Sequence, residues 1–189
     1  MSERIYHPQI GSIELITGPM FSGKTEELIR RVSRAHIAKL NAKLFKPDID
    51  TRYSANHVVS HNQRKLEAIN VESPKEILGL SVDADVVGID EIQFFGEELI
   101  DVCTNLANGG KRVIVAGLDK NYKGLPFSPL PNLLAVADYV TKLQAVCMQC
   151  GAPATFTSRI DKNKNQEILL GERFEYEAFC RKCFHNASR

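Results

Sequence analysis

Residues 13–25 read IELITGPMFSGKT. Its second half, residues 18–25, fits the pattern G-x-x-x-x-G-K-[ST] of a phosphate-binding loop. The apolar run before Gly18 predicts a buried strand, and the spacing of apolar residues after Lys24 predicts a helix. A strand, a glycine loop and a helix in this order direct backbone N–H groups and the positive helix end toward one point, which suits a polyphosphate. The alternative is a chance glycine turn before a helix, but the two flanking elements favour a nucleotide-binding site.

The residues of this loop have separate expected roles. Gly18 and Gly23 allow backbone angles and close approaches that a Cβ would block. Lys24 is predicted to reach the β- and γ-phosphates, and the Thr25 hydroxyl to ligate Mg²⁺. The predicted ATP-binding residues of the loop are Gly18, Pro19, Met20, Phe21, Ser22, Gly23, Lys24 and Thr25.

Residues 85–91, DVVGIDE, form a second informative stretch. An apolar run that ends in acids is typical of a buried parallel strand that delivers a carboxylate to the carboxyl edge of a sheet. Asp90 is predicted to hold Mg²⁺ and its hydration shell, and Glu91 is a candidate base. Alone, the pattern also fits an ordinary polar strand end, but beside a phosphate-binding loop it favours a catalytic site.

The rest of the first 146 residues alternates short apolar runs with helical periodicity. Strands are predicted at 43–46, 57–60, 67–71, 111–119 and 139–146, and helices at 74–80, 96–108 and 132–137. Ser73 is a predicted helix cap, and Cys103 lies on an apolar stripe as a small buried residue rather than a nucleophile. The alternation predicts an α/β fold with a mainly parallel sheet, in the class of phosphate-loop kinases and ATPases.

The loop at residues 120–132 carries Tyr122 and Phe127 beside Gly124 and three prolines. In a parallel sheet this loop leaves the same edge as the phosphate-binding loop, so its aromatic residues would form a wall for a flat ligand. Simple packing of the two rings against the core is the alternative.

Composition agrees with a compact enzyme. The 189 residues are 43% hydrophobic, enough for one substantial core and a small satellite module. No apolar run approaches the roughly 20 residues of a membrane span, and the first residues show no signal-peptide pattern, so the expected compartment is the cytoplasm. Lys and Arg number 24 against 23 Asp and Glu, a balance that argues against binding to nucleic acid or anionic membranes.

The composition changes at Cys147. Two C-x-x-C pairs, Cys147 with Cys150 and Cys180 with Cys183, flank a polar, β-rich insert. This pattern predicts one structural Zn²⁺ with four thiolate ligands, because a full tetrahedron leaves no open position. His185 in place of one cysteine, and a redox role for either pair, are the alternatives. The expected domains are residues 1–146, the nucleotide-binding core, and residues 147–189, the zinc-binding segment.

Four stretches together resemble the cytosolic-type (type II) thymidine kinases. They are GPMFSGKT at 18–25, DTRYS at 50–54, IDEIQFF at 89–95 and the paired cysteines, and the resemblance extends from about residue 12 to residue 183. It implies a RecA-like core, a zinc-bearing lasso domain, ATP–Mg²⁺ as the donor and thymidine as the acceptor, in deoxynucleoside salvage for DNA synthesis. It also implies a homotetramer and feedback by dTTP.

The resemblance also assigns residues. It makes Glu91 the base, Arg52 a phosphate-contacting residue beside Lys24, and the run Asp90, Glu91, Ile92 and Gln93 part of the ATP site. The implied nucleoside-contacting residues are Met20, Phe94, Leu118, Tyr122, Phe127, Thr157, Leu169, Leu170, Gly171 and Tyr176.

The segment between the two cysteine pairs is expected to respond to a bound nucleoside. Residues 161–167, DKNKNQE, contain no apolar side chain, so the segment from about 159 to 179 is expected to be mobile and to order with nucleoside. An ATP-hydrolysing motor and a zinc-ribbon binding module are the rival functions. The aromatic residues after Glu91 and in the 120–132 loop favour the kinase.

Overall fold

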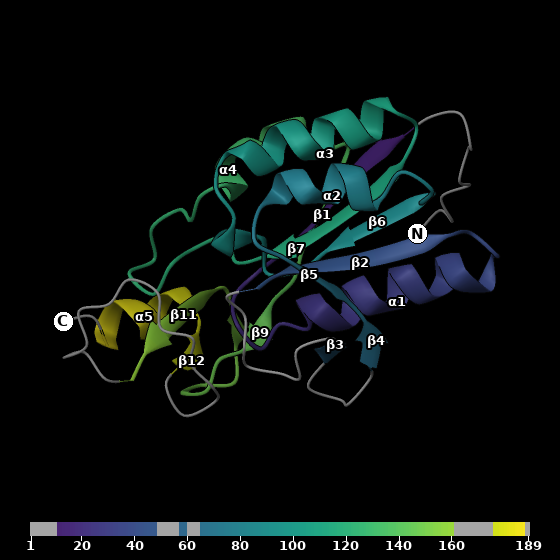
Figure 1. Cartoon of the computed structure of the whole chain (residues 1–189). Helices are drawn as coiled ribbons and strands as arrows, with labels where there is room; N and C mark the ends of the chain where they lie inside the picture. Colours follow the sequence, from purple (N-terminus) through teal and green to yellow (C-terminus); the bar gives the residue numbers. More distant parts are fainter. Residues whose placement is uncertain (1–10, 49–56, 60–64, 161–175, 188–189) are drawn as a thin grey trace.

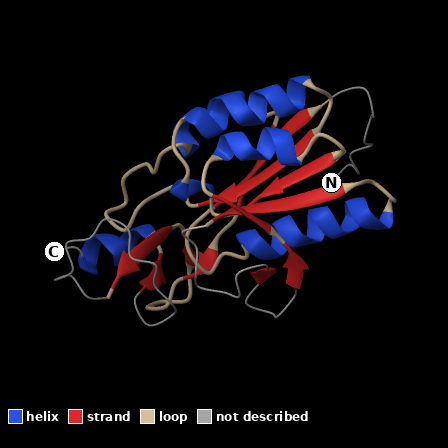
Figure 2. Cartoon of the chain, viewed as in Figure 1, coloured by secondary structure: helices blue, strands red, loops and turns tan. Residues whose placement is uncertain are grey.

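A six-stranded parallel sheet forms the centre of the protein (Figures 1 and 2). The computed structural model describes residues 11–48, 57–59, 65–160 and 176–187. The strand order is β5-β2-β6-β7-β1-β8, and every neighbouring pair is parallel. The strands are β1 (Ser12–Thr17), β2 (Ala42–Pro47), β5 (Ile69–Val71), β6 (Val86–Ile89), β7 (Arg112–Gly117) and β8 (Tyr139–Lys142). The predicted α/β fold with a mainly parallel sheet is confirmed.

Helices cover both faces of this sheet. Helix α1 (Lys24–Ile37) packs on one face, and α2 (Pro74–Leu80), α3 (Glu98–Asn108) and α4 (Leu130–Val136) lie on the other, as Figure 1 shows. Successive β1 residues serve the two layers, because Ile16 packs with α1 and Leu15 packs with α3 and α4. Among the helices of the described residues, none combines the length and the apolar content that a membrane crossing requires.

A smaller set of elements follows the sheet. Strand β9 (Ala145–Val146) pairs with β10 (Pro153–Ala154), β11 (Phe156–Arg159) pairs with β12 (Tyr176–Phe179), and helix α5 (Arg181–Ala187) follows. These elements lie at the carboxyl ends of the central strands (Figure 1). Strands β3 (His57–Val59) and β4 (Lys65–Glu67) form a separate antiparallel hairpin near α1.

Most element boundaries agree with the sequence, and the differences have local causes. The prediction of one strand over 139–146 is wrong, because β8 pairs with β1 whereas β9 leaves the sheet to pair with β10. The run at 67–71 is likewise divided between β4 and β5. Helix α4 begins two residues earlier than predicted, since Pro131 is tolerated in a first helical turn. Ser73 caps α2 as predicted, and the structure adds that it forms a full capping box with Glu76.

An ion-pair cluster anchors α1 to the centre of the sheet. Glu14, on β1, is 3% exposed and accepts hydrogen bonds from Arg31 of α1 at 2.6 Å and from Arg112 of β7 at 2.7 Å. Burial by itself would raise the pKa of Glu14, but hydrogen bonds and charge from Arg112, then from Arg31, outweigh it and hold that pKa below its ordinary value. The cluster therefore depends on a charged Glu14.

We predict that Glu14→Gln lowers the free energy of unfolding by about 3 kcal/mol, because it leaves two guanidinium groups without their buried counter-charge. Urea unfolding at pH 7 measures the change. Lys75→Gln is the control, since it breaks an exposed pair with Glu98 outside the cluster and should cost under about 1 kcal/mol. Equal losses in both variants would contradict the special role of the buried cluster.

The same variant has a predicted pH dependence. Because the pKa of Glu14 is lower in the folded than in the unfolded protein, its stabilisation is complete above the unfolded pKa and is lost as pH falls through the folded pKa. Glu14→Gln lacks this term at every pH. The difference in unfolding free energy between wild type and variant should therefore shrink below about pH 4.5, and a constant or growing difference would refute it.

Candidate functional site

The phosphate-binding loop is built at the carboxyl end of β1. Gly18 has φ 147°, and a Cβ there would lie 2.5 Å from the carbonyl oxygen of Leu143. Gly23 has φ 82° and is the N-cap of α1, so the helix begins directly at Lys24. Both glycines occupy the kind of position for which the sequence predicted them. Phe21 also has a positive φ, 64°, which the sequence did not reveal.

The polar groups of the loop turn inward. Lys24 Nζ and Ser22 Oγ each donate a hydrogen bond to the carbonyl oxygen of Pro19, both at 2.8 Å. Thr25 Oγ1 donates to Asp90 Oδ2 at 3.0 Å. Thr25 is the second residue of α1 whereas Asp90 follows β6, so the sheet brings together the two predicted magnesium residues from positions 65 residues apart.

Asp90 lies in an environment that resists its negative charge. It is 4% exposed, and burial followed by the neighbouring charge of Glu91 raises the pKa of Asp90 to about 7. The Glu91 N–H, the Thr25 hydroxyl and the Lys24 charge act in the opposite direction. A divalent cation at Asp90 would favour the charged carboxylate in the same way. Oxygen ligands of this kind suit Mg²⁺.

Glu91 is held in an unusual backbone conformation. Its φ of 52° lies in the left-handed region, and it is the N-cap of the short 3₁₀ helix η1 (Ile92–Phe94). Its N–H donates to Asp90 Oδ1 at 2.9 Å, and its carboxylate accepts a hydrogen bond from Gln93 Nε2. Gln93 is 4% exposed, and its Oε1 accepts from the Leu118 N–H at 3.1 Å. Gln93 thus connects Glu91 to the residue after β7, a contact that its prediction as an ATP-binding residue did not include.

The loop after β7 and the C-terminal strands meet the phosphate-binding loop. The N–H of Met20 donates to Thr157 Oγ1, on β11, at 2.9 Å. Tyr122 and Phe127 are half-buried in the loop that leaves β7, at the same sheet edge as predicted, and Tyr176 is buried on β12. The partly buried Phe94 lies in η1. The predicted nucleoside-contacting residues that the structure describes therefore lie on segments around one sheet edge.

Several predicted site residues lie outside the described residues. They are Arg52, Leu169, Leu170 and Gly171, together with most of the 159–179 segment expected to be mobile. Arg159 is a buried residue that sequence reasoning missed. Its guanidinium contacts the rings of both Tyr122 and Tyr176. Arg159 lies opposite Tyr176 in the pair of β11 and β12. The sequence could not predict this pairing, because the register of two strands separated by a long insert cannot be read from sequence.

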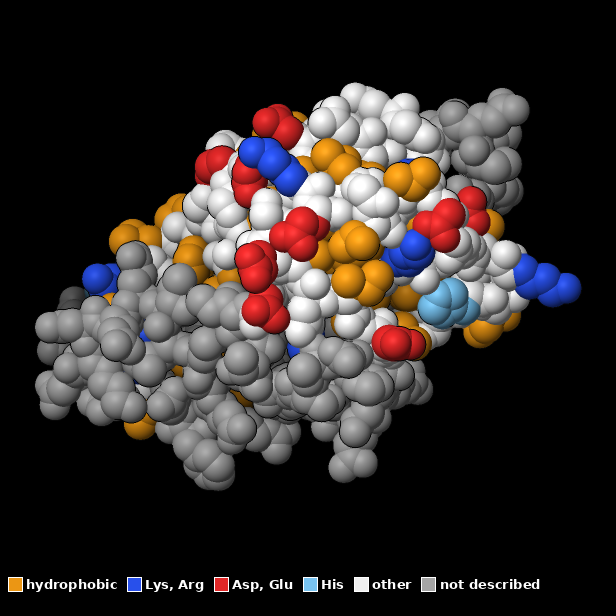
Figure 3. All heavy atoms as spheres, viewed as in Figure 1, with side chains coloured by type: hydrophobic (Ala, Val, Ile, Leu, Met, Phe, Trp, Pro, Cys, Tyr) orange, Lys and Arg blue, Asp and Glu red, His pale blue; other side chains and the backbone are white. Residues whose placement is uncertain are grey.

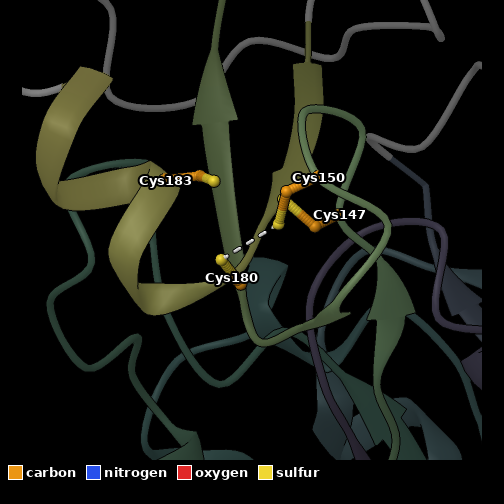
Figure 4. Close-up of side chains that lie close together, drawn as sticks. All are labelled: Cys147, Cys150, Cys180 and Cys183. Atoms are coloured by element: carbon orange, nitrogen blue, oxygen red, sulfur yellow. Dashed lines mark hydrogen bonds between the residues drawn. The ribbon is translucent and has the colours of Figure 1, made fainter.

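Four cysteines form a compact cluster in the C-terminal segment (Figure 4). Cys147 and Cys150 come from the turn between β9 and β10, Cys180 follows β12, and Cys183 lies on α5. Their four sulfur atoms lie within 4.8 Å of one another, and the Cys150 and Cys180 sulfurs are 3.7 Å apart. A tetrahedral Zn²⁺ with bonds of about 2.3 Å places its sulfur ligands about 3.8 Å apart. The four thiols therefore fit a structural zinc site.

Electrostatics in this cluster favour a bound cation. Burial opposes ionisation of Cys147, but the backbone N–H groups of Cys180, Gln149 and Cys150 lower the pKa of Cys147 to about 6. Burial and the three neighbouring sulfurs raise the pKa of Cys183 to about 12. Four thiolates this close repel one another unless a cation lies between them, which is the function that Zn²⁺ performs.

Two other residues, His185 and Cys103, are not part of this cluster. His185 is exposed, and the metal-binding group found among the described residues consists of the four cysteines without it. Cys103 lies in the core with no exposed surface, and burial raises the pKa of its thiol to about 12. Cys103 is therefore the small buried residue that the sequence predicted.

The surface carries mixed charge where Figure 3 shows it. On the described part of that face, several Asp and Glu side chains lie near one another, whereas the Lys and Arg side chains are separate and form no continuous patch there.

Comparison with known proteins gives consistent results. A family model described as "Thymidine kinase" matches residues 11–184. A thymidine kinase of Bacteroides fragilis is 53% identical over 177 residues, which are 94% of this chain and 88% of the relative. One of Bacteroides thetaiotaomicron is 54% identical over the same shares.

Among solved structures, domain III of the Thermotoga maritima replication initiation protein DnaA matches with a TM-score of 0.44 and 17% identity. The match covers 73% of this chain and 57% of that one, and at this level it carries no argument. The residues that the family model matches include the phosphate-binding loop, Asp90, Glu91 and the four cysteines, and the relatives match 94% of the chain. The chain therefore belongs to the thymidine kinase family.

Proposed function

We propose that this protein transfers the γ-phosphoryl group of ATP to the 5′-hydroxyl of thymidine, giving dTMP for nucleotide salvage. Membership of the family supports this activity. The structural observation that carries it is the contact between Thr25 and Asp90 with Glu91 alongside. In this proposal Thr25 and Asp90 are the magnesium-binding pair, and Glu91 beside them is the carboxylate base. Deoxyuridine, which lacks only the thymine methyl group, is a second candidate acceptor.

Residues of the loop bind and neutralise the phosphates in this proposal. The loop amides and Lys24 contact the β- and γ-phosphates, which requires Lys24 to exchange its hydrogen bond with Pro19 for one with the nucleotide. Thr25 and Asp90 hold Mg²⁺, which when bound neutralises charge that develops on the transferring group. Arg52 is proposed to contact the same phosphates on the basis of the DTRYS motif.

Glu91 is the proposed general base. A sugar hydroxyl is a weak nucleophile with a high pKa, so a positioned carboxylate accepts its proton as the hydroxyl attacks the γ-phosphorus. The strained backbone of Glu91 and the hydrogen bond from Gln93 fix where that carboxylate points. The loop amides would stabilise the negative charge that develops on the β-phosphate of the leaving ADP, and Mg²⁺ held by Thr25 and Asp90 would add to this effect.

The nucleoside is proposed to bind between the core loop and the C-terminal strands. Thymine is flat and partly apolar, which suits contact with Phe94 and Phe127. Met20, Leu118, Tyr122, Thr157 and Tyr176 complete the proposed contacts among the described residues, and Leu169, Leu170 and Gly171 would add backbone contacts. An enclosed site of this kind also excludes water and so limits hydrolysis of ATP.

The cysteine cluster is proposed to hold one structural Zn²⁺ that fixes the shape of the C-terminal segment. A stack of Phe156 on Phe184, with ring centroids 4.6 Å apart, joins β11 to α5 beside the cysteines. Gly124 of the core loop packs under this stack, where a Cβ would lie 3.0 Å from Phe184. Through these contacts the zinc would support the wall of the nucleoside site.

The proposal also covers the assembly of the protein and its location in the cell. Strand β8 lies at an edge of the sheet, and its Tyr139 and Val140 are exposed together with Leu134 and Val136 of α4. An exposed apolar edge of this kind suits contact with a second copy, in keeping with the homotetramer that the family resemblance implies. Five free cysteines suit the reducing cytoplasm. Feedback by dTTP follows from the resemblance alone.

One assay separates this proposal from its rivals. Purified protein is incubated with ATP–Mg²⁺ and a panel of nucleosides, and both nucleoside monophosphate and free phosphate are followed. The proposal expects dTMP with little free phosphate. An ATPase would release phosphate steadily without nucleoside, and a binding module would show no turnover; either result would overturn the proposal.

We predict that Glu91→Gln lowers kcat by roughly 10²–10⁴-fold while ATP and thymidine still bind, because the variant retains shape but cannot accept a proton. Steady-state kinetics and calorimetric binding measure the two effects. Glu72→Gln, which neutralises an exposed carboxylate outside the site, is the control and should keep normal kcat. Near-normal turnover of Glu91→Gln would place the base elsewhere, with Asp50 as the first candidate.

We predict that wild-type protein purified without chelator contains one Zn²⁺ per chain and that Cys180→Ser does not. Loss of a structural zinc removes folding free energy on the order of 10 kcal/mol by analogy with zinc-finger peptides, so the C-terminal segment should unfold. Elemental analysis and limited proteolysis measure both effects. Cys103→Ser is the matched control and should retain full zinc, because Cys103 lies apart in the core. Full zinc in Cys180→Ser would refute the assignment.

A further inference from the structure

Arg159 joins two aromatic residues that come from different parts of the protein. It lies on β11 and is 4% exposed. Its guanidinium carbon is 4.1 Å from the centroid of the Tyr122 ring and 5.6 Å from that of Tyr176, and its Nη2 donates to the Tyr176 hydroxyl at 3.2 Å. We propose that Arg159 is a positioning residue that sets the separation of these rings and so the affinity for the nucleoside. This inference rests on the proposed function.

The Tyr176 side of the contact is fixed by strand pairing. Arg159 and Tyr176 are directly opposite each other in the antiparallel pair of β11 and β12. Facing side chains in such a pair lie close enough to interact. Tyr176 is 7% exposed, so its ring and hydroxyl are held by buried contacts and not by solvent. Arg159 therefore presents its guanidinium to Tyr176 from a defined direction.

The Tyr122 side of the contact is fixed by a tight turn. The buried Asn121 side-chain oxygen accepts hydrogen bonds from the N–H groups of Lys123 at 3.0 Å and Leu125 at 3.1 Å. The Gly124 N–H donates to the Asn121 carbonyl at 2.9 Å. Tyr122 thus projects from a tied loop of the core, and Arg159 reaches it from the C-terminal sheet.

The chemistry of the contact requires arginine in particular. A planar guanidinium stacks on an aromatic face and still donates hydrogen bonds along its edge, whereas a lysine ammonium is a compact, strongly hydrated charge. Lys123 offers a natural contrast, because its Nζ lies 5.5 Å from the same Tyr122 ring but its side chain is exposed. Of these two cations only Arg159 is buried, so Arg159 is the one that can fix the position of the Tyr122 ring.

The position of Arg159 predicts which kinetic constant it controls. The phosphate-binding residues Lys24 and Thr25 are in the first turn of α1, whereas Arg159 is on β11 and contacts Tyr122 and Tyr176. Arg159→Lys should therefore raise KM for thymidine roughly tenfold. KM for ATP should stay within about twofold, and kcat should fall less than threefold because Glu91 and the magnesium residues are unaffected. A merely structural role would lower the amount of active enzyme without this split.

A double-mutant cycle gives the sharper test. Tyr176→Phe keeps the ring and removes the hydroxyl that Arg159 contacts, so it should raise KM for thymidine by roughly threefold. If Arg159 acts through that hydroxyl, the double variant with Arg159→Lys should show a KM no higher than Arg159→Lys alone. Multiplying effects would show that the two residues act on the nucleoside independently and would overturn the inference.

Controls separate this inference from folding and from the proposed function. Lys123→Met removes the exposed cation near Tyr122 and should leave KM for thymidine unchanged. Each variant is compared with wild type by zinc content and thermal unfolding, so kinetic constants refer to folded enzyme. A wild type that phosphorylates no nucleoside would refute the proposed function and this inference together. An active wild type with an unchanged KM in Arg159→Lys would refute this inference alone.

Discussion

The hydrogen bond between Thr25 and Asp90 is the contact on which the site depends. It can form only because β1 and β6 run parallel, with β7 between them, so that both strands end at the same edge. The same parallel arrangement brings the other loops of the site to this edge. The phosphate-binding loop leaves β1, the carboxylates follow β6, and the loop with Tyr122 and Phe127 follows β7. A parallel sheet thus collects polar groups from distant parts of the chain at one point, while helices cover its two mainly apolar faces.

The C-terminal segment acts on this edge by direct contact. The N–H of Met20 is bound by Thr157, and Lys120 of the core loop donates to the Thr155 carbonyl at 3.1 Å. The same Lys120 lies 5.0 Å from the Phe156 ring. These contacts join the phosphate-binding loop, the loop after β7 and strand β11 into one continuous surface. We propose that Zn²⁺ held by the four cysteines would stabilise the C-terminal side of this surface and take no part in phosphoryl transfer.

The sequence predicted the sheet, most helices and the four-cysteine cluster because each has a strong local signal. Glycine spacing identified the phosphate-binding loop, period-3.6 apolar residues identified α3, and Ser73 as a helix cap marked the start of α2. What it missed depends on tertiary contacts. The break between β8 and β9 arises because the partner strand changes from β1 to β10, although the apolar run is continuous. The links made by Gln93 and by Arg159 join segments far apart in sequence, and no local pattern encodes them.

Phe21 has a consequence for how separable the two parts of the chain are. It belongs to the phosphate-binding loop, yet its ring packs in the apolar cluster of Ala145, Cys147, Ala154, Ala178, Phe179 and Cys183. Its left-handed backbone directs it there. A chain cut after residue 146 would leave this ring without most of that cluster, at the turn proposed to hold a triphosphate. We therefore infer that the first 146 residues are not separable from the C-terminal segment. Exchange of the cysteine segment would also require changes in the loop that carries Phe21.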